Sequence, residues 1–227
     1  MPEALLTADQ VSRVFTTGAG DVHALTDVSM DVAAGELVVV RGPSGSGKTT
    51  LLNLLGGLDR PTSGRVLLGD GRELSALPEK DVLEVRRTQI GYVFQSFGLI
   101  PVLSAAENVE IPLRLLEVDP AEREERVAAA LELVGLAGHA KQRPYELSGG
   151  QQQRVGIARA LVAEPRILIA DEPTGQLDSK TAATIMELIQ DLTHARDLAA
   201  VVSTHDPVLM QRADRVVELH DGALVPA

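Results

Sequence analysis

The chain has 227 residues, of which 44% are hydrophobic and 23% are charged, and both values are ordinary for a folded globular protein. Its net charge of −11 argues against a general nucleic-acid surface, because phosphate backbones are bound by clustered Lys and Arg. The absence of cysteine excludes disulfides and thiolate metal sites, and no apolar run approaches the roughly 18–20 residues needed to span a bilayer.

The first part of the chain predicts strands of two kinds. Segments that alternate apolar and polar residues, VHALTDVSMDV and GRVLLGD, predict antiparallel strands. The continuous apolar run ELVVVRG instead predicts a buried strand of a parallel sheet, because such strands are covered on both faces. Further along the chain, RILIAD and LAAVVSTH show the same pattern. Each of these runs ends in polar residues, at the edge where an open parallel sheet binds its ligand.

A glycine-rich loop follows the first of these buried strands. The segment Gly42-Pro43-Ser44-Gly45-Ser46-Gly47-Lys48-Thr49 matches G-x-x-x-x-G-K-[ST], and an apolar helical start, TLLNLLGGL, comes directly after it. Its glycines let successive N–H groups face a phosphate, and the helix N-terminus adds partial positive charge. Lys48 can then reach the β- and γ-phosphates, and the Thr49 hydroxyl can bind Mg²⁺.

The middle of the chain, from about residue 75 to 142, has helical patterns. Ser104 with Glu107 forms a possible capping box. Asp119-Pro120-Ala121-Glu122 supplies an N-cap, a proline at the first helical position and an acid in the first turn. The helix that follows carries Val127, Leu131 and Val134 on one face, and Gly135 ends it. We interpret this region as a helical lobe inserted between two halves of a nucleotide-binding sheet.

A second glycine-rich segment, LSGGQQQRV, opens another helix. Ser148 and Gln151 form a capping box, so the segment is a good helix start. A cap alone does not require Gly149 and Gly150, because each costs about 1 kcal/mol against alanine inside a helix. We therefore expect a group, an anion above all, to approach this bare backbone closely.

Two later strands end in groups suited to phosphate chemistry. ILIADEPT places Asp171 where a carboxylate anchors Mg²⁺, and Glu172 where one can polarise an attacking water, although a solvated turn is the structural alternative. VVSTHDP places His205 after a strand, where a plain polar cap is the alternative. Gln95, after a short aromatic strand, can touch both Mg²⁺ and water, or be an ordinary surface glutamine. The final segment, RVVELHDGALV, predicts antiparallel strands with a hairpin turn at Asp221-Gly222.

Taken together, these motifs resemble those of the ATP-binding cassette (ABC) ATPases. The phosphate loop, Gln95, LSGGQ, ILIADEPT, GQLDS and His205 occur in that family's order and spacing, from Val11 to Leu224. More narrowly, LLNLLGGLDRPTSG and GLIPVLSAAENVEIPL look like the subgroup of lipoprotein-release, macrolide-export and cell-division cassettes.

The resemblance implies a role for each matching residue. Catalytic roles fall on Glu172 as general base, His205 as the switch histidine, Gln95 and Lys48. Phe15 matches the aromatic residue that stacks on adenine, although tyrosine is more usual there, and Gln176 stands where asparagine or alanine is typical. Mg²⁺ is assigned to Thr49, Gln95 and Asp171. The other nucleotide contacts are assigned to Gly42, Pro43, Ser44, Gly45, Ser46, Gly47, Lys48, Thr49, Thr50, Ser148, Gly149, Gly150, Gln151 and Asp178.

The resemblance also implies a fold and partners. The expected fold is α/β, a P-loop NTPase (RecA-like) core with an N-terminal antiparallel β subdomain and an inserted α-helical subdomain. Residues 1–94 and 144–227 would form the core and about 95–143 the helical subdomain, within one domain. The cofactors are ATP and Mg²⁺. The partners are a second copy of the chain, bound head to tail, and integral-membrane permease subunits at the cytoplasmic face of the inner membrane, with no nucleic acid.

The aromatic and apolar stretch YVFQSFGLIPVL is a candidate docking groove for the permease, and simple packing of the lobe is the alternative for Phe97, Leu99 and Ile100. Two other functions use the same motifs. One is an ABC-type ATPase that serves nucleic acid or cell division, and the chain lacks the coiled-coil or zinc modules of the nucleic-acid type. The other is a non-hydrolysing regulator, against which Glu172 and His205 argue.

Overall fold

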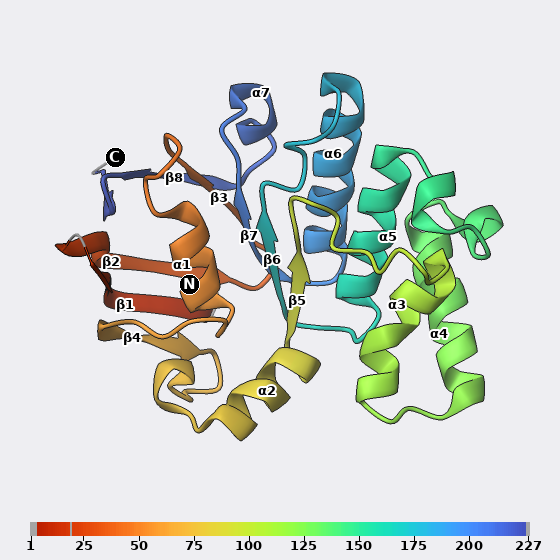
Figure 1. The fold of residues 1–227 in the computed structure, drawn as a ribbon, viewed down its shortest axis with the longest axis horizontal. Coiled ribbons are helices and arrows are strands. Elements are labelled where there is room, and N and C mark those ends of the chain that lie inside the picture. The colour runs from red at the N-terminus through yellow and green to blue at the C-terminus, as the bar shows by residue number, and fades with distance from the viewer. Residues whose placement is uncertain (1–3, 19, 226–227) are drawn as a thin grey trace.

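The computed structural model describes residues 4–18 and 20–225, and it contains two β-sheets flanked by helices (Figure 1). The smaller sheet has three antiparallel strands in the order β2-β1-β4. Its strands are β1 (Ala4–Thr17), β2 (Gly20–Ala33) and β4 (Ser63–Leu68). The two segments with alternating patterns thus form β2 and β4, as predicted, because alternation gives each strand one buried and one exposed face.

The larger sheet has six strands in the order β5-β6-β7-β3-β8-β9. The three continuous apolar runs form its parallel centre, as predicted. β8 was expected in an antiparallel pair, and it does pair with β9 through a turn at Asp221 and Gly222, where both φ angles are positive. Its other edge, however, pairs in parallel with β3. The strands are β3 (Leu37–Arg41), β5 (Ile90–Val93), β6 (Ile167–Asp171), β7 (Ala199–Ser203), β8 (Arg215–His220) and β9 (Ala223–Leu224).

The helices lie on both faces of the six-stranded sheet and in a separate group beside it (Figure 1). The α-helices are α1 (Lys48–Leu55), α2 (Glu79–Thr88), α3 (Ala105–Leu115), α4 (Pro120–Leu133), α5 (Gly149–Leu161), α6 (Ser179–Ala195) and α7 (Pro207–Met210). The short 3₁₀ turns are η1 (Leu74–Ala76), η2 (Ala137–His139) and η3 (Pro144–Glu146).

The core consists of two apolar clusters, one on each face of the six-stranded sheet. Successive side chains of a strand point to opposite faces, so Val39 of β3 joins one cluster while Val38 and Val40 join the other. The first cluster continues into α3, α4, α5 and α6, and the second contains α1 and the three-stranded sheet. Burial on both faces explains why these strands have continuous apolar sequences.

The helical lobe is inserted between two neighbouring strands. β5 and β6 pair directly, with Ile90 beside Ile167, although α3, α4 and α5 separate them in the sequence. The predicted capping box of Ser104 with Glu107 forms at the start of α3, and Asp119 caps α4. One apolar cluster runs through both the lobe and the sheet, so a division at about residues 95 and 143 stays a prediction.

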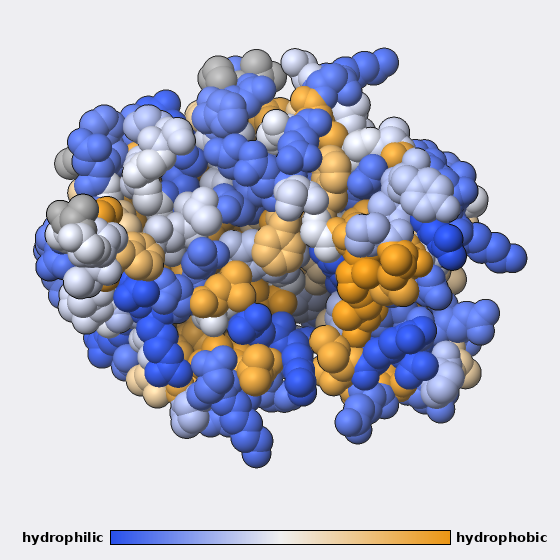
Figure 2. Space-filling view, in the orientation of Figure 1, coloured by the Kyte–Doolittle hydropathy of each residue, from blue (hydrophilic) through white to orange (hydrophobic). Residues whose placement is uncertain are grey.

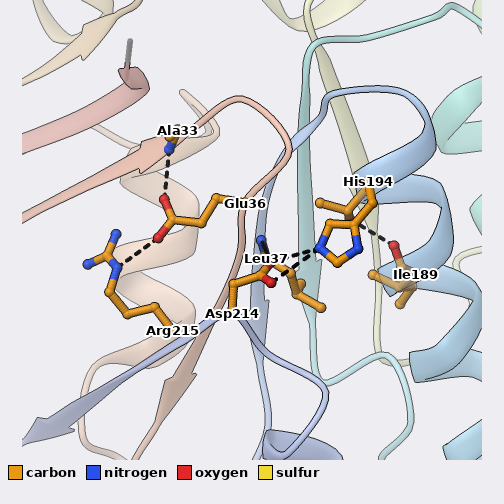
Figure 3. A network of polar contacts seen from close by, with 8 residues as sticks. Ala33, Glu36, Leu37, Ile189, His194, Asp214 and Arg215 are labelled. Carbon is orange, nitrogen blue, oxygen red and sulfur yellow. Dashed lines mark hydrogen bonds and ion pairs between the residues drawn. The ribbon is translucent and has the colours of Figure 1, made fainter. Parts of the chain in front are cut away.

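A polar network fixes the beginning of β3, the strand that leads into the glycine-rich loop (Figure 3). The Leu37 N–H donates to Asp214 (2.8 Å), and the same carboxylate lies 3.0 Å from Nε2 of His194 at the end of α6. Glu36 accepts from the Ala33 N–H and from Arg215, at 2.8 Å each. The strand is therefore tied to α6, β2 and β8 at the end opposite the glycine-rich loop.

Candidate active site

The candidate active site lies where the parallel strands end. The register places Asp171, the last residue of β6, beside Ser203, the last of β7, and Ser203 opposes Val40 of β3. Parallel strands share one carboxyl edge, so polar residues that follow separate apolar runs meet there.

The glycine-rich loop joins β3 to α1, in the strand–loop–helix arrangement predicted. α1 begins at Lys48 after Gly47, whose φ of 102° is a conformation that favours glycine. The Lys48 side chain is buried, and its Nζ donates to the carbonyls of Gly42 (2.9 Å) and Pro43 (3.0 Å). The buried Ser46 Oγ has no hydrogen-bond partner within the described chain.

Two glycines of this loop are required by close packing within the chain. A Cβ on Gly42 would lie 2.1 Å from the carbonyl oxygen of Leu219 in β8. A Cβ on Gly47 would lie 2.4 Å from the carbonyl oxygen of Ala24 in β2. The loop is thus pressed against both sheets, and any side chain at these positions would push it away. Pro43, Ser44, Gly45 and Thr49 are exposed, and Thr50 is half-buried.

Ser203 connects the Asp171 carboxylate to the backbone of Glu172, and the sequence analysis did not select it. Its Oγ donates to Asp171 Oδ1 (2.7 Å) and accepts from the Glu172 N–H (2.8 Å), and the residue is fully buried. Glu172 has a φ of 43°, so the chain turns sharply after β6. Ser203 was detectable as the last residue of an apolar run of the same kind as the one ending at Asp171, but only the strand register pairs the two.

Glu172, Gln95 and His205 are brought together at this edge. Glu172 Oε2 lies 3.4 Å from the Gln95 amide nitrogen, and Glu172 Oε1 lies 3.6 Å from His205 Nδ1. The Glu172 side chain is 23% exposed and that of His205 is 69% exposed, so the cluster faces solvent. A water molecule held there would have a carboxylate, an amide and an imidazole within reach, and these groups are suited to general-base hydrolysis.

The LSGGQ segment starts α5 with the predicted capping box. The Gln151 N–H donates to Ser148 Oγ (3.3 Å), and the Ser148 N–H donates to Gln151 Oε1 (2.8 Å). The two glycines also have a reason within the chain, which the sequence analysis missed. A Cβ on Gly150 would lie 2.5 Å from Thr181 Cγ2, and one on Gly149 would lie 3.3 Å from Leu177. At Gly150, the bare backbone is therefore required first by packing against the start of α6.

Thr181 joins this segment to Asp178. Its methyl group opposes Gly150, while its hydroxyl donates to Asp178 Oδ2 (2.6 Å). Asp178 also caps α6 by accepting from the N–H groups of Lys180 and Thr181. The side-chain hydrogen bond from Thr181, with these backbone donors, lowers the pKa of Asp178. The carboxylate stays ionised beside the start of α5.

The LSGGQ segment and the glycine-rich loop stand apart. α1 and α5 lie on opposite sides of strands β5 to β7 in Figure 1. In the described part of the chain, no hydrogen bond or ion pair joins residues 42–50 to residues 148–151. Phe15 lies near the end of β1 and is 37% exposed. The structure thus brings Lys48, Asp171, Glu172, Gln95 and His205 to one sheet edge and leaves Ser148 at the start of α5, apart from the glycine-rich loop.

Comparison with known proteins places these features in a family. Residues 25–175 match the family model described as "ABC transporter". The ABC transporter ATP-binding protein YtrE of Bacillus subtilis is 45% identical over 224 residues, covering 97% of this chain and 96% of the relative. The macrolide export ATP-binding/permease protein MacB of Brucella melitensis biotype 1 is 44% identical over 221 residues, covering 97% of this chain and 34% of the relative.

The solved structures agree with the sequence relatives. A dimeric structure of the ATP-binding cassette MJ0796, in a post-hydrolysis state with ADP and Pi, matches with a TM-score of 0.89 at 40% identity, over 97% of both chains. The fold is therefore that of the ABC ATPase cassettes, as the sequence predicted, and the chain belongs to the ABC transporter family. It is the ATP-binding, ATP-hydrolysing subunit of such a transporter. No helix within residues 4–18 and 20–225 is both long and apolar enough to cross a membrane.

The bridging role of Ser203 generates a prediction. Ser203→Ala removes a buried hydroxyl that orients Asp171 and the turn at Glu172, so we expect kcat for ATP hydrolysis to fall about tenfold and stability by about 1–3 kcal/mol. Steady-state phosphate release and urea unfolding measure the two effects. Thr193→Ala is the matched control, because its buried hydroxyl bonds to Ile189 O within α6, away from the strand ends. Equal kcat values in the two variants would show that strand pairing alone places the carboxylates.

Proposed function

We propose that this chain powers an export-type membrane permease through a head-to-tail dimer that closes on MgATP. One observation carries this proposal. The hydrolytic groups gather at one sheet edge around the phosphate loop, while the capped, glycine-bearing start of α5 lies on the other side of strands β5 to β7 from α1. A second copy can supply that segment to the nucleotide held by the first.

The residues present fit a nucleoside triphosphate with Mg²⁺. The buried Ser46 hydroxyl without a partner and the Lys48 ammonium, folded back onto two carbonyls of its own loop, are donors suited to phosphate oxygens. Thr49, Gln95 and Asp171 offer the oxygen ligands that Mg²⁺ prefers, and Mg²⁺ takes few protein ligands when phosphates supply the others. Bound there, Mg²⁺ would neutralise phosphate charge.

Hydrolysis assigns separate tasks to the chain's own residues. Glu172 accepts a proton from the attacking water, and its carboxylate is oriented through the Ser203 bond to its backbone N–H. His205, 3.6 Å from that carboxylate, would contact the terminal phosphate from the neighbouring strand end. Gln95 completes the cluster from β5, the strand that continues into the helical lobe. Movement of the lobe can therefore shift Gln95 relative to the attacking water.

The dimer is supported by the separation of the two halves of the site and by the relatives. Each ATP would lie between the glycine-rich loop of one copy and the Ser148–Gln151 segment of the other. Two matching structures of MJ0796 are dimeric, one of them with ADP and Pi. Asp178, tied to Gly150 through Thr181, would lie at the same interface and connect the two sites.

A groove of about 400 Å³ between α2 and α3 supports the permease as partner. Apolar side chains stand on both sides of a hollow in the lower half of Figure 2, and the exposed ones include Leu58, Leu83, Phe94 and Leu115. Arg86 and Arg87 line it without an ion pair to any described residue. The groove fits a helical segment with an apolar face and an acidic side chain. Its occupant would be the cytoplasmic segment of a permease, and the chain would then lie at the inner face of the cell membrane.

The groove differs in part from the stretch selected in the sequence. Tyr92 and Phe94 line it, with their rings stacked at 4.6 Å between centroids. Phe97 is half-buried and Leu99 packs against the core, so for these two the packing alternative applies. Phe94 directly precedes Gln95, so a segment bound in the groove would contact a residue adjacent in sequence to the hydrolytic cluster.

Glu172→Gln should trap the closed dimer. The amide cannot accept the water proton, so ATP stays intact, and we expect light scattering to give twice the chain mass with saturating MgATP. Adding Ser148→Arg should return the protein to the monomer while ATP binding by each monomer changes little, because Ser148 lies away from the glycine-rich loop of its own chain. A Glu172→Gln protein that stays monomeric in MgATP would contradict the dimer proposal.

Reversing the charge of the groove should separate the subunit from its permease. In Arg86→Glu with Arg87→Glu we expect loss of the permease during affinity purification from native membranes, with the ATPase rate of the isolated subunit unchanged. Lys80→Glu, on an exposed position of the same helix, is the matched control and should retain the permease. Retention of the permease by the double variant would refute this docking site.

A further inference from the structure

Arg13 covers the ring of Phe15. The two residues are two apart on β1, so their side chains project from the same face of the strand. The guanidinium carbon of Arg13 lies 4.4 Å from the centroid of the Phe15 ring. A cation over an aromatic face is attracted by the ring quadrupole. One face of this ring is thus occupied by the protein itself.

Asp59 holds Arg13 in that place. Its carboxylate accepts from Nε (2.8 Å) and from Nη2 (2.9 Å) of Arg13, which is the bidentate geometry that fixes a guanidinium plane. The two side chains are 25% and 30% exposed, so the pair is shielded from water more than an ordinary surface ion pair. Asp59 itself is anchored, since its N–H donates to the carbonyl of Asn53 in α1 (3.3 Å).

This arrangement connects the ring to the phosphate-binding helix. α1 begins at Lys48, beside the glycine-rich loop, and the turn after its last residue carries Asp59. The Asp59–Arg13 pair therefore ties β1 to α1 and sets the ring of Phe15 in relation to the loop. Phe15 lacks the hydroxyl of a tyrosine, so its ring has no hydrogen bond of its own to orient it.

We propose that Arg13 is a positioning residue for nucleotide binding. Clamped by Asp59, it backs one face of the Phe15 ring and holds the opposite face in place to stack on the adenine base. The proposal rests on the proposed function in one respect, that Phe15 is the surface on which the base stacks. Its physical content is preorganisation: a ring already fixed loses less freedom when the base arrives.

The experiment compares a ligand with a base and one without, by calorimetric titration of Mg-ADP and Mg-pyrophosphate. In Arg13→Ala we expect ADP to bind about threefold to tenfold more weakly and pyrophosphate to bind as in the parent chain. Asp59→Asn, which releases the clamp, should shift ADP in the same direction. Arg13→Lys keeps the cation but not the bidentate geometry, so its ADP affinity should lie between those of the parent chain and Arg13→Ala.

Two further variants decide whether the effect passes through the ring. In a Phe15→Ala background, Arg13→Ala should cause no additional loss of ADP affinity. Arg65→Ala removes another ion pair to β1, the one with Asp9, which does not involve Phe15. This variant should leave the ratio of ADP affinity to pyrophosphate affinity unchanged.

Three results would overturn the proposal. Equal weakening of ADP and pyrophosphate in Arg13→Ala would indicate a role in folding alone. Unchanged ADP binding in Arg13→Ala would show that the ring needs no support. An unchanged ratio of ADP affinity to pyrophosphate affinity in Phe15→Ala would show that the base does not stack on this ring. Retained pyrophosphate binding and ATPase activity in that variant would leave the proposed function intact.

Discussion

The in-register parallel pairing of β5, β6, β7 and β3 is the constraint on which the rest of the structure depends. It places Asp171 beside Ser203 and brings the glycine-rich loop, Glu172, Gln95 and His205 to one edge of the sheet, although they come from segments far apart in the sequence. A slip by one residue would move the buried side chains to the opposite face and break the Ser203 bridge. Catalytic geometry and core packing are therefore specified by the same register.

The same sheet also explains why a second copy would complete the site in the proposed dimer. The lobe is inserted between β5 and β6, so its one link from the sheet passes through Gln95 and its return passes through α5. The start of α5 is held by its own chain, with Gly150 against Thr181 and Thr181 bonded to Asp178. Ser148 is thus presented on a firmly packed surface, away from Lys48. In the proposed dimer, ATP would join the two surfaces, and Gln95 would couple hydrolysis to the groove in which a permease segment would bind.

Local sequence signals predicted much of this structure. The apolar runs, the glycine-rich loop, the caps at Ser104, Asp119 and Ser148, and the turn at Asp221-Gly222 each depend on a few neighbouring residues, and each formed as predicted. What could not be predicted depends on register between distant segments. Ser203 becomes a bridge only beside Asp171, Gly150 needs Thr181 of another helix, and Arg13 meets Asp59 only because α1 packs against β1. β8 likewise pairs in parallel with β3 because its position is set by the sheet rather than by its hairpin.

The central claim is that each ATP site is completed by a second chain, and complementation between two inactive variants tests it most directly. Lys48→Ala removes the phosphate contact from both sites of its homodimer, and Ser148→Arg blocks both sites from the opposite side. Mixed dimers contain one site with an intact loop and an intact LSGGQ segment. Mixing equal amounts should restore roughly a quarter of the parent ATPase rate, because half of random pairs are mixed and each has one intact site of two. A mixture no more active than the two variants assayed separately would contradict the account.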